Sequence, residues 1–108
     1  MYQFSWDSRA REGRFGAAHA LEIPFTFNTL DRAGVDMFIG EGEVPHGLAE
    51  VVHDAWISFI SDGDPSTTTL GHWPTYEPDT RAVMDLDQEC RVLHDPAADE
   101  RLLWDGIR

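Results

Sequence analysis

The segment from Leu48 to Ile60 constrains the fold of this chain most, because apolar residues recur in it at helical spacing. They stand three or four positions apart, at Leu48, Val51, Val52, Ala55, Trp56, Phe59 and Ile60. Residues at that spacing share one face of an α-helix, and so apolar a face is buried against another layer. Gly63 and Pro65 then end the helix, through a left-handed cap and a ring that blocks continuation. The chain therefore needs a second apolar layer for this helix.

Strand patterns at both ends of the chain are candidates for that layer. Tyr2, Phe4 and Trp6 alternate with polar residues, which is typical of a strand with one buried face. Between residues 81 and 94, two runs of β-forming residues flank the polar residues 87–89, which predicts a strand and a hairpin-like return. The sequence thus predicts a mixed α/β chain of about three strands and three helices.

Two further segments are shorter. Leu21–Phe27 contains Pro24 and predicts a short helix or turn, because proline suits a first helical turn better than a central strand. Residues 30–45 contain three glycines and no sustained period, so we expect a loop there.

A last helix is expected after Asp95. That residue would cap it, with Pro96 at the first position and the acidic residues 99 and 100 in the first turn. Leu103 and Ile107 stand four positions apart and would share its buried face.

Length and charge bound the function. The 108 residues predict one domain, residues 1–108, and the formal net charge of -12 argues against nucleic acid or an anionic membrane surface as a partner. The chain begins without the basic-then-apolar order of a signal peptide, and no apolar run approaches the ~20 residues of a membrane span. Its single cysteine, Cys90, permits no internal disulfide, so we expect a cytoplasmic location.

The predicted strands are too few for a closed or well-covered sheet. One strand and one hairpin leave long unpaired edges, and Met1 stands directly before the first strand pattern. We therefore expect a piece of a longer protein, with partly uncovered apolar faces at residues 2, 4 and 6 and on the helix 51–60. Self-association into a homo-oligomer, by edge pairing or exchange of an element, would cover them.

His19 is the first candidate for chemistry. It lies between small residues and the apolar segment that starts at Leu21. Histidine titrates near neutral pH and serves as a general base, but a structural side chain suits this position as well. Glu22 could orient or charge-balance the ring, or could be a partly solvated carboxylate at a helix start. The residues alone leave these alternatives open.

A general base needs a nucleophile, and the sequence presents none. No serine stands in the G-x-S-x-G turn that exposes a hydrolase nucleophile. The serines are Ser5, Ser8, Ser58, Ser61 and Ser66. Cys90 lies in a β-rich run, which favours an inert, buried thiol over an activated one.

A metal site is not predicted either. His46 and His53 would share a helix face if the helix began early, but no third ligand stands at helical spacing. The acid pairs Asp62/Asp64 and Asp85/Asp87 lack the spacing of an EF-hand loop and are interpreted as solvated turn acids.

The segment GAAHALEIPFTF resembles the histidine segment of the type-B carboxylesterases, an α/β-hydrolase family that includes p-nitrobenzyl esterases and cholinesterases. In that motif a glycine precedes the triad histidine by three residues, and a glutamate, an Ile-Pro-Phe-like run and an aromatic residue follow. The matching positions are Gly16, His19, Glu22, Ile23, Pro24, Phe25 and Phe27. Later stretches are also similar to the family: AWISFISDGDPS, HWPTYEP, RAVMDLD and DPAADERLLWDGI.

The resemblance implies a partial α/β-hydrolase, made of the C-terminal strands and helices of that fold. It implies that His19 is the general base and acid of a serine esterase and that Glu22 is a buried supporting carboxylate. The family's nucleophile serine, triad acid and oxyanion-hole glycines precede the histidine in the chain and have no counterpart here. The implied substrate is a small-molecule carboxylic ester in the full-length context, and no cofactor or metal is implied.

We therefore expect the C-terminal part of a serine carboxylic-ester hydrolase, inactive by itself. Two alternatives remain open. The chain could be a non-enzymatic remnant or interaction domain that keeps part of the hydrolase fold, or a separate polypeptide could supply the missing N-terminal hydrolase portion.

Overall fold

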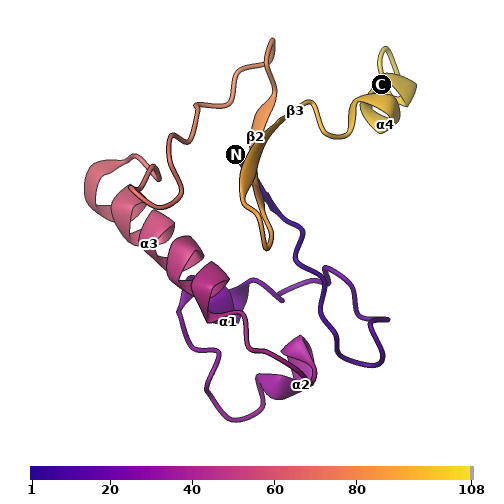
Figure 1. The fold of residues 1–108 in the computed structure, drawn as a ribbon. Coiled ribbons are helices and arrows are strands. Elements are labelled where there is room, and N and C mark those ends of the chain that lie inside the picture. The colour runs from indigo at the N-terminus through magenta and orange to yellow at the C-terminus, as the bar shows by residue number, and fades with distance from the viewer. Residues whose placement is uncertain (108) are drawn as a thin grey trace.

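Figure 1 shows the computed structural model of the chain, which describes residues 1–107. These residues form a mixed α/β arrangement, as predicted, with the expected three strands and one helix more than expected. In chain order the elements are β1 (Tyr2–Phe4), α1 (Ile23–Thr26), α2 (Asp36–Ile39), α3 (His46–Asp62), β2 (Ala82–Leu86), β3 (Arg91–His94) and α4 (Ala98–Leu103).

The three strands form one sheet in the order β1-β2-β3. β1 is parallel to β2, so that Tyr2 lies opposite Met84 and Phe4 opposite Leu86. β2 and β3 pair antiparallel, which confirms the predicted hairpin. The sheet therefore joins segments that are about 80 residues apart in sequence.

Asp85 lies in the central strand β2, and its side chain links the neighbouring strands. The residue is only 4% exposed. The Gln3 amide donates a 3.0 Å hydrogen bond to Asp85 Oδ1, and the Ser5 hydroxyl donates to the same oxygen. Arg91 Nε lies 3.6 Å from Oδ2. The interpretation of Asp85 as a solvated turn acid is therefore wrong, because all five residues of β2 are buried.

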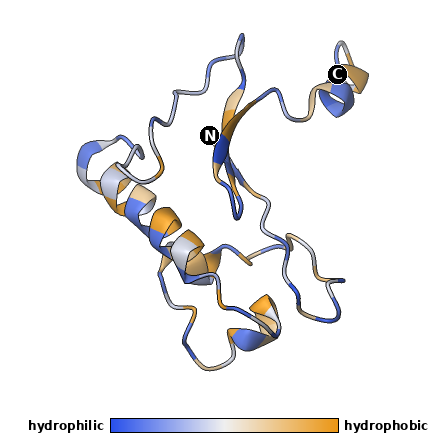
Figure 2. Cartoon of the chain, viewed as in Figure 1, coloured by the Kyte–Doolittle hydropathy of each residue, from blue (hydrophilic) through white to orange (hydrophobic). Residues whose placement is uncertain are grey.

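The predicted long helix is confirmed as α3, which lies beside the sheet in Figure 1. It ends at Gly63, whose left-handed backbone (φ 78°) donates its N–H to the Phe59 carbonyl at 2.9 Å. Three of its four buried residues, Leu48, Ala49 and Val52, belong to one apolar cluster with residues of α1 and β2. Figure 2 shows orange, apolar segments along this helix. The cluster comprises Trp6, Leu21, Phe25, Leu30, Ile39, Leu48, Ala49, Val52, Met84 and Leu86. No helix among residues 1–107 combines the length and the apolar character needed to span a membrane.

The predicted exposed faces are confirmed only in part. Trp6 is buried, contrary to expectation, because it packs on Phe25 with ring centroids 5.2 Å apart and lies under the Arg9 guanidinium. Tyr2 is partly exposed, and Ile60 at the end of α3 is 72% exposed.

The expected loop over residues 30–45 contains a short helix, α2, so that prediction is wrong for four of its residues. Contacts with residues far away in sequence explain the helix. Ile39 is buried in the core and accepts the Arg9 N–H at 3.1 Å, while the Ser8 hydroxyl donates to the Phe38 carbonyl. Gly40 then turns the chain with a positive φ of 79°.

The last helix differs from its prediction in start, cap and burial. α4 begins at Ala98, and Asp95 accepts two hydrogen bonds from the Arg101 guanidinium, at 3.0 and 2.7 Å, in place of capping the helix. No residue of α4 is buried, and Leu103 is 73% exposed. The prediction that Leu103 and Ile107 form a buried face is wrong. α4 lies away from the sheet, at the end of the segment that follows β3 (Figure 1).

Gly40→Ala should lower the free energy of unfolding by at least about 2 kcal/mol. An ideal Cβ at residue 40 would lie 2.3 Å from the Ala10 nitrogen, and the positive φ strains any L side chain. Urea denaturation measures the change. Gly47→Ala is the matched control, since its Cβ meets nothing within 4 Å in α3, and it should stabilise by roughly 0.5–1 kcal/mol. Equal effects of the two substitutions would contradict the close packing at Gly40.

The attachment of α4 should weaken in acid. Hydrogen bonds from Arg101, with its charge and that of Arg81, hold the pKa of Asp95 below the ordinary value of 3.8. A carboxylate whose pKa is lowered in the folded state stabilises that state at pH values above its pKa in the unfolded chain. This contribution is lost as the pH falls through the lowered pKa. The NMR signal of the Arg101 Nε–H, which donates to Asp95, should therefore change below about pH 4. In Asp95→Asn this signal should show no such step, and a transition near neutral pH would contradict this assignment.

Candidate functional site

His19 lies exposed in a tight turn. The Leu21 N–H closes the turn by donating to the Ala18 carbonyl at 3.2 Å. Leu21 and Phe25 are fully buried, so the backbone after the histidine is anchored in the core. The sequence thus presents one titratable ring to solvent from a rigid support.

The short helix α1 follows this turn, and its prediction is confirmed, with Pro24 in the first turn. The Thr26 N–H donates to the Glu22 carbonyl at 2.9 Å. His53 of α3 bonds through Nδ1 to the Thr26 carbonyl at 2.9 Å, and the carbonyl can only accept, so Nδ1 carries the proton. α3 therefore holds α1 and the turn of His19 in place.

Glu22 is half-buried directly before α1. It lines an apolar groove between α1 and α3 together with His53 and Trp56. The pKa of Tyr2 is raised, first by burial and then by the negative charge of Glu22. Within residues 1–107 no hydrogen bond or ion pair joins the side chains of His19 and Glu22.

Four of the five serine hydroxyls have hydrogen-bond partners other than His19. Within residues 1–107 none of the hydrogen bonds joins a serine to His19. Ser5 donates to Asp85, Ser8 to the Phe38 carbonyl, Ser58 to the carbonyls of Asp64 and Ser66, and Ser66 accepts from the Trp73 N–H. Ser61 lies exposed near the end of α3. The histidine therefore has no nucleophile in the described part of the chain.

Cys90 is half-buried and its Sγ lies 3.4 Å from the Asp87 carbonyl. Burial raises the pKa of this thiol, and the nearby charges of Asp85 and Asp87 raise it further. A raised pKa keeps the thiol protonated at neutral pH, which agrees with the inert thiol that the sequence predicts.

The two histidines considered as metal ligands have other partners. α3 does begin at His46, so His46 and His53 share this helix. His46 Nε2 lies 3.4 Å from Asp31 Oδ1, whereas His53 is bonded to α1. In the part of the chain that the structure describes, no three His, Cys, Asp or Glu side chains lie close enough to hold a metal ion.

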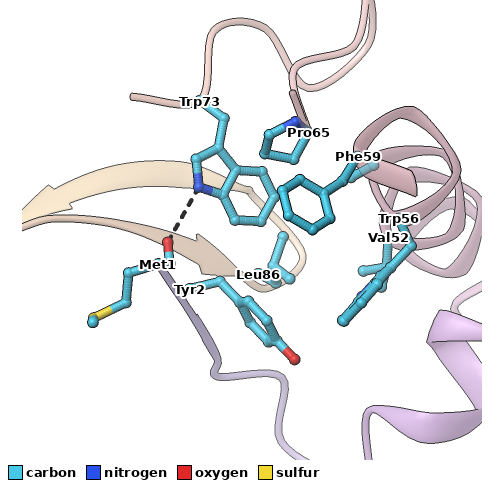
Figure 3. Close-up of a pocket in the computed structure, with 9 residues that line it drawn as sticks. Met1, Tyr2, Val52, Trp56, Phe59, Pro65, Trp73 and Leu86 are labelled. Carbon is cyan, nitrogen blue, oxygen red and sulfur yellow. Dashed lines mark hydrogen bonds between the residues drawn. The ribbon is translucent and has the colours of Figure 1, made fainter. Parts of the chain in front are cut away.

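Sequence reasoning missed an apolar pocket of about 220 Å³ (Figure 3). Tyr2 stands edge-on to Trp56 and Trp73, with ring centroids 6.3 and 6.2 Å away. The Trp73 indole N–H donates to the Met1 carbonyl at 3.2 Å, as the dashed line in Figure 3 marks. Because the aromatic rings come from β1, α3 and the connector between α3 and β2, no local pattern could have revealed the pocket.

Solved structures similar to this chain are esterases. A PNB esterase matches with a TM-score of 0.82 at 34% identity, over 94% of this chain and 21% of that one. A carboxylesterase from Geobacillus stearothermophilus matches with a TM-score of 0.79 at 34% identity, over 96% and 21% of the two chains. The predicted fold class, part of an α/β-hydrolase, is confirmed.

The model of the carboxylesterase family matches residues 1–104. Phenmedipham hydrolase from Pseudarthrobacter oxydans is 38% identical over 99 residues, which are 89% of this chain and 20% of that protein. Para-nitrobenzyl esterase from Bacillus subtilis is 35% identical over 104 residues, 94% and 20% of the two proteins. The chain belongs to the carboxylesterase family, as the resemblance indicated, and spans about a fifth of the length of these relatives.

Proposed function

We propose that this chain supplies the general base of a serine carboxylic-ester hydrolase, and that His19 is that base. The observation that carries the proposal is the exposed ring of His19 on a turn whose last residue, Leu21, is fully buried. A base that serves a nucleophile from another segment must be both accessible and held in place. The family match over residues 1–104 supports the same role.

In this mechanism His19 transfers one proton in each half-reaction. It accepts the serine proton as the hydroxyl attacks the ester carbonyl, and it returns that proton to the departing alcohol, which leaves an acyl-enzyme. It then takes a proton from water, hydroxide attacks the acyl group, and the ring returns the proton to the serine oxygen. The proposed substrate is an uncharged small-molecule carboxylic ester, and no cofactor takes part.

The serine, the triad acid and the oxyanion donors are proposed to come from sequence other than these residues. The hydrogen bonds of the serines in residues 1–107 support this division, because none reaches His19. The chain alone is therefore predicted to lack triad-dependent esterase activity. The alternative is a remnant or interaction domain that catalyses no reaction. The exposed apolar residues of α3 and α4 favour this alternative, because such residues mark surfaces that bind a partner.

Glu22 is proposed as a supporting carboxylate of the same site. Its place directly before α1, half-buried and three residues after His19, supports that role. A cytoplasmic location is proposed as well. Its support is that a chain with a single cysteine forms no internal disulfide and therefore suits a reducing compartment.

Grafting tests the proposed base directly. The part of this chain that matches the Bacillus subtilis para-nitrobenzyl esterase, 94% of it at 35% identity, would replace the corresponding segment of that enzyme. The graft should hydrolyse p-nitrophenyl acetate, and His19→Ala in it should lower kcat by at least about 10³-fold, because the proton acceptor is lost. Circular dichroism checks that both grafts are folded.

His72→Ala is the matched control, since His72 is also exposed but lies in the connector between α3 and β2. It should leave kcat within about twofold of the graft. A folded graft without activity, or a His19→Ala graft as active as its parent, would contradict the proposed function.

We also propose that the isolated chain self-associates. Within residues 1–107 no strand pairs with the outer edges of β1 and β3. Large apolar side chains are exposed on all four helices of the described residues, among them Ile23, Met37, Ile57, Phe59, Ile60, Leu102 and Leu103. Covering such a surface is favourable by roughly 25 cal/mol per Å².

Light scattering at micromolar concentration should therefore show dimers or larger species. Ile60→Glu should shift the population toward monomer, because it places a charge on the apolar surface of α3. Thr68→Glu, which adds the same charge at an exposed position in the connector, should have little effect. A folded, stable monomer at this concentration would refute self-association.

A further inference from the structure

We infer that Ala20 is a positioning residue for His19, an inference that rests on the proposed function. Ala20 adopts a left-handed backbone, with φ at +67°. Residues other than glycine, asparagine and aspartate rarely adopt this conformation, because Cβ crowds the neighbouring carbonyl oxygen. Such a conformation persists only where the surrounding structure holds it, and it often marks a functional site.

The contacts around Ala20 hold it in this conformation. On its C-terminal side, Leu21 is fully buried, and its N–H donates to the Ala18 carbonyl at 3.2 Å across the turn. The Ala20 carbonyl itself accepts the Ile23 N–H at 3.3 Å, which ties it to the start of α1. The backbone is thus fixed on the core side of Ala20.

His19 lies on the other, solvent-exposed side of the same residue. Because Leu21 is anchored, a change of φ at Ala20 cannot be taken up by the core and has to reorient the exposed residue before it. The left-handed conformation of Ala20 therefore sets the direction of the His19 ring. Displacing a reacting group by about 1 Å can lower a rate by about 10²-fold.

The left-handed residue nearest to Ala20 on its C-terminal side, Asn28, has an ordinary explanation that Ala20 lacks. Asn28, with φ at 49°, follows α1, and the Thr29 N–H donates to the Pro24 carbonyl at 2.8 Å. An asparagine in this place is a common way to end a helix. Ala20 ends no helix and precedes α1 by three residues. Its strained conformation coincides only with the turn that presents His19.

Three substitutions in the grafted esterase described above test this inference. Ala20→Val disfavours a positive φ, whereas Ala20→Asn is of similar size and tolerates it, and Ala20→Gly tolerates it with no side chain. Valine should lower kcat by at least about tenfold while KM changes less than about twofold, because the ring moves and the substrate surface does not. Asparagine and glycine should restore kcat to within about threefold of the graft.

Asn28→Val is the matched control. It imposes the same strain at another left-handed residue outside the turn of His19, so it should lower the melting temperature and leave kcat unchanged. In parallel, NMR of the 108-residue chain should show the strong intraresidue HN–Hα NOE of a positive φ at Ala20, a readout that needs no activity.

A negative φ at Ala20 would overturn the inference. So would full kcat in the valine variant, or equal losses of kcat in the valine and asparagine variants, since side-chain size would then explain the effect. These results leave the proposed function intact as long as His19→Ala inactivates the graft. Activity of the His19→Ala graft would instead overturn the proposed function, and with it any positioning role for Ala20.

Discussion

The buried carboxylate of Asp85 is the interaction on which the remaining structure depends. It accepts hydrogen bonds from Gln3 and Ser5, and thereby joins β1 to a strand about 80 residues later. A buried carboxylate without these donors would be strongly destabilising, so the pairing and the burial require each other. β1 leads directly to Trp6, which packs on Phe25. Phe25 belongs to α1 and anchors the turn of His19, so the proposed base is held by contacts that begin at Asp85.

The elements predicted correctly from the sequence are those that local pattern and turn residues determine. The period of α3 and its cap at Gly63, the proline in the first turn of α1, and the β2-β3 hairpin all belong to this kind. Most of the errors concern residues whose state depends on distant segments. α2 forms where Gly40 lies against Ala10, and Asp85 is buried by β1. The error at α4 is local, since Asp95 binds Arg101 six residues later in place of capping the helix.

The features of the candidate site also divide into those that the sequence predicts and those that depend on distant segments. The spacing of Gly16, His19 and Glu22 identified the segment, and the match over residues 1–104 establishes the family. The sequence could not show that the charge of Glu22 acts on Tyr2, because those residues meet only through the packing of β1 near α1. Nor could it reveal the left-handed backbone of Ala20, since alanine carries no signal for a positive φ. The aromatic rings of the pocket in Figure 3 likewise come from segments far apart in sequence, β1, α3 and the connector.

The central claim is that His19 is a base whose nucleophile lies outside these residues. Intact-mass spectrometry of the 108-residue chain after exposure to a fluorophosphonate tests it most directly, because such probes modify only a serine that a base activates. The account predicts an unmodified mass for both the folded chain and its His19→Ala variant. One adduct per chain that disappears in the variant would show that His19 activates a serine within this sequence, and would contradict the account.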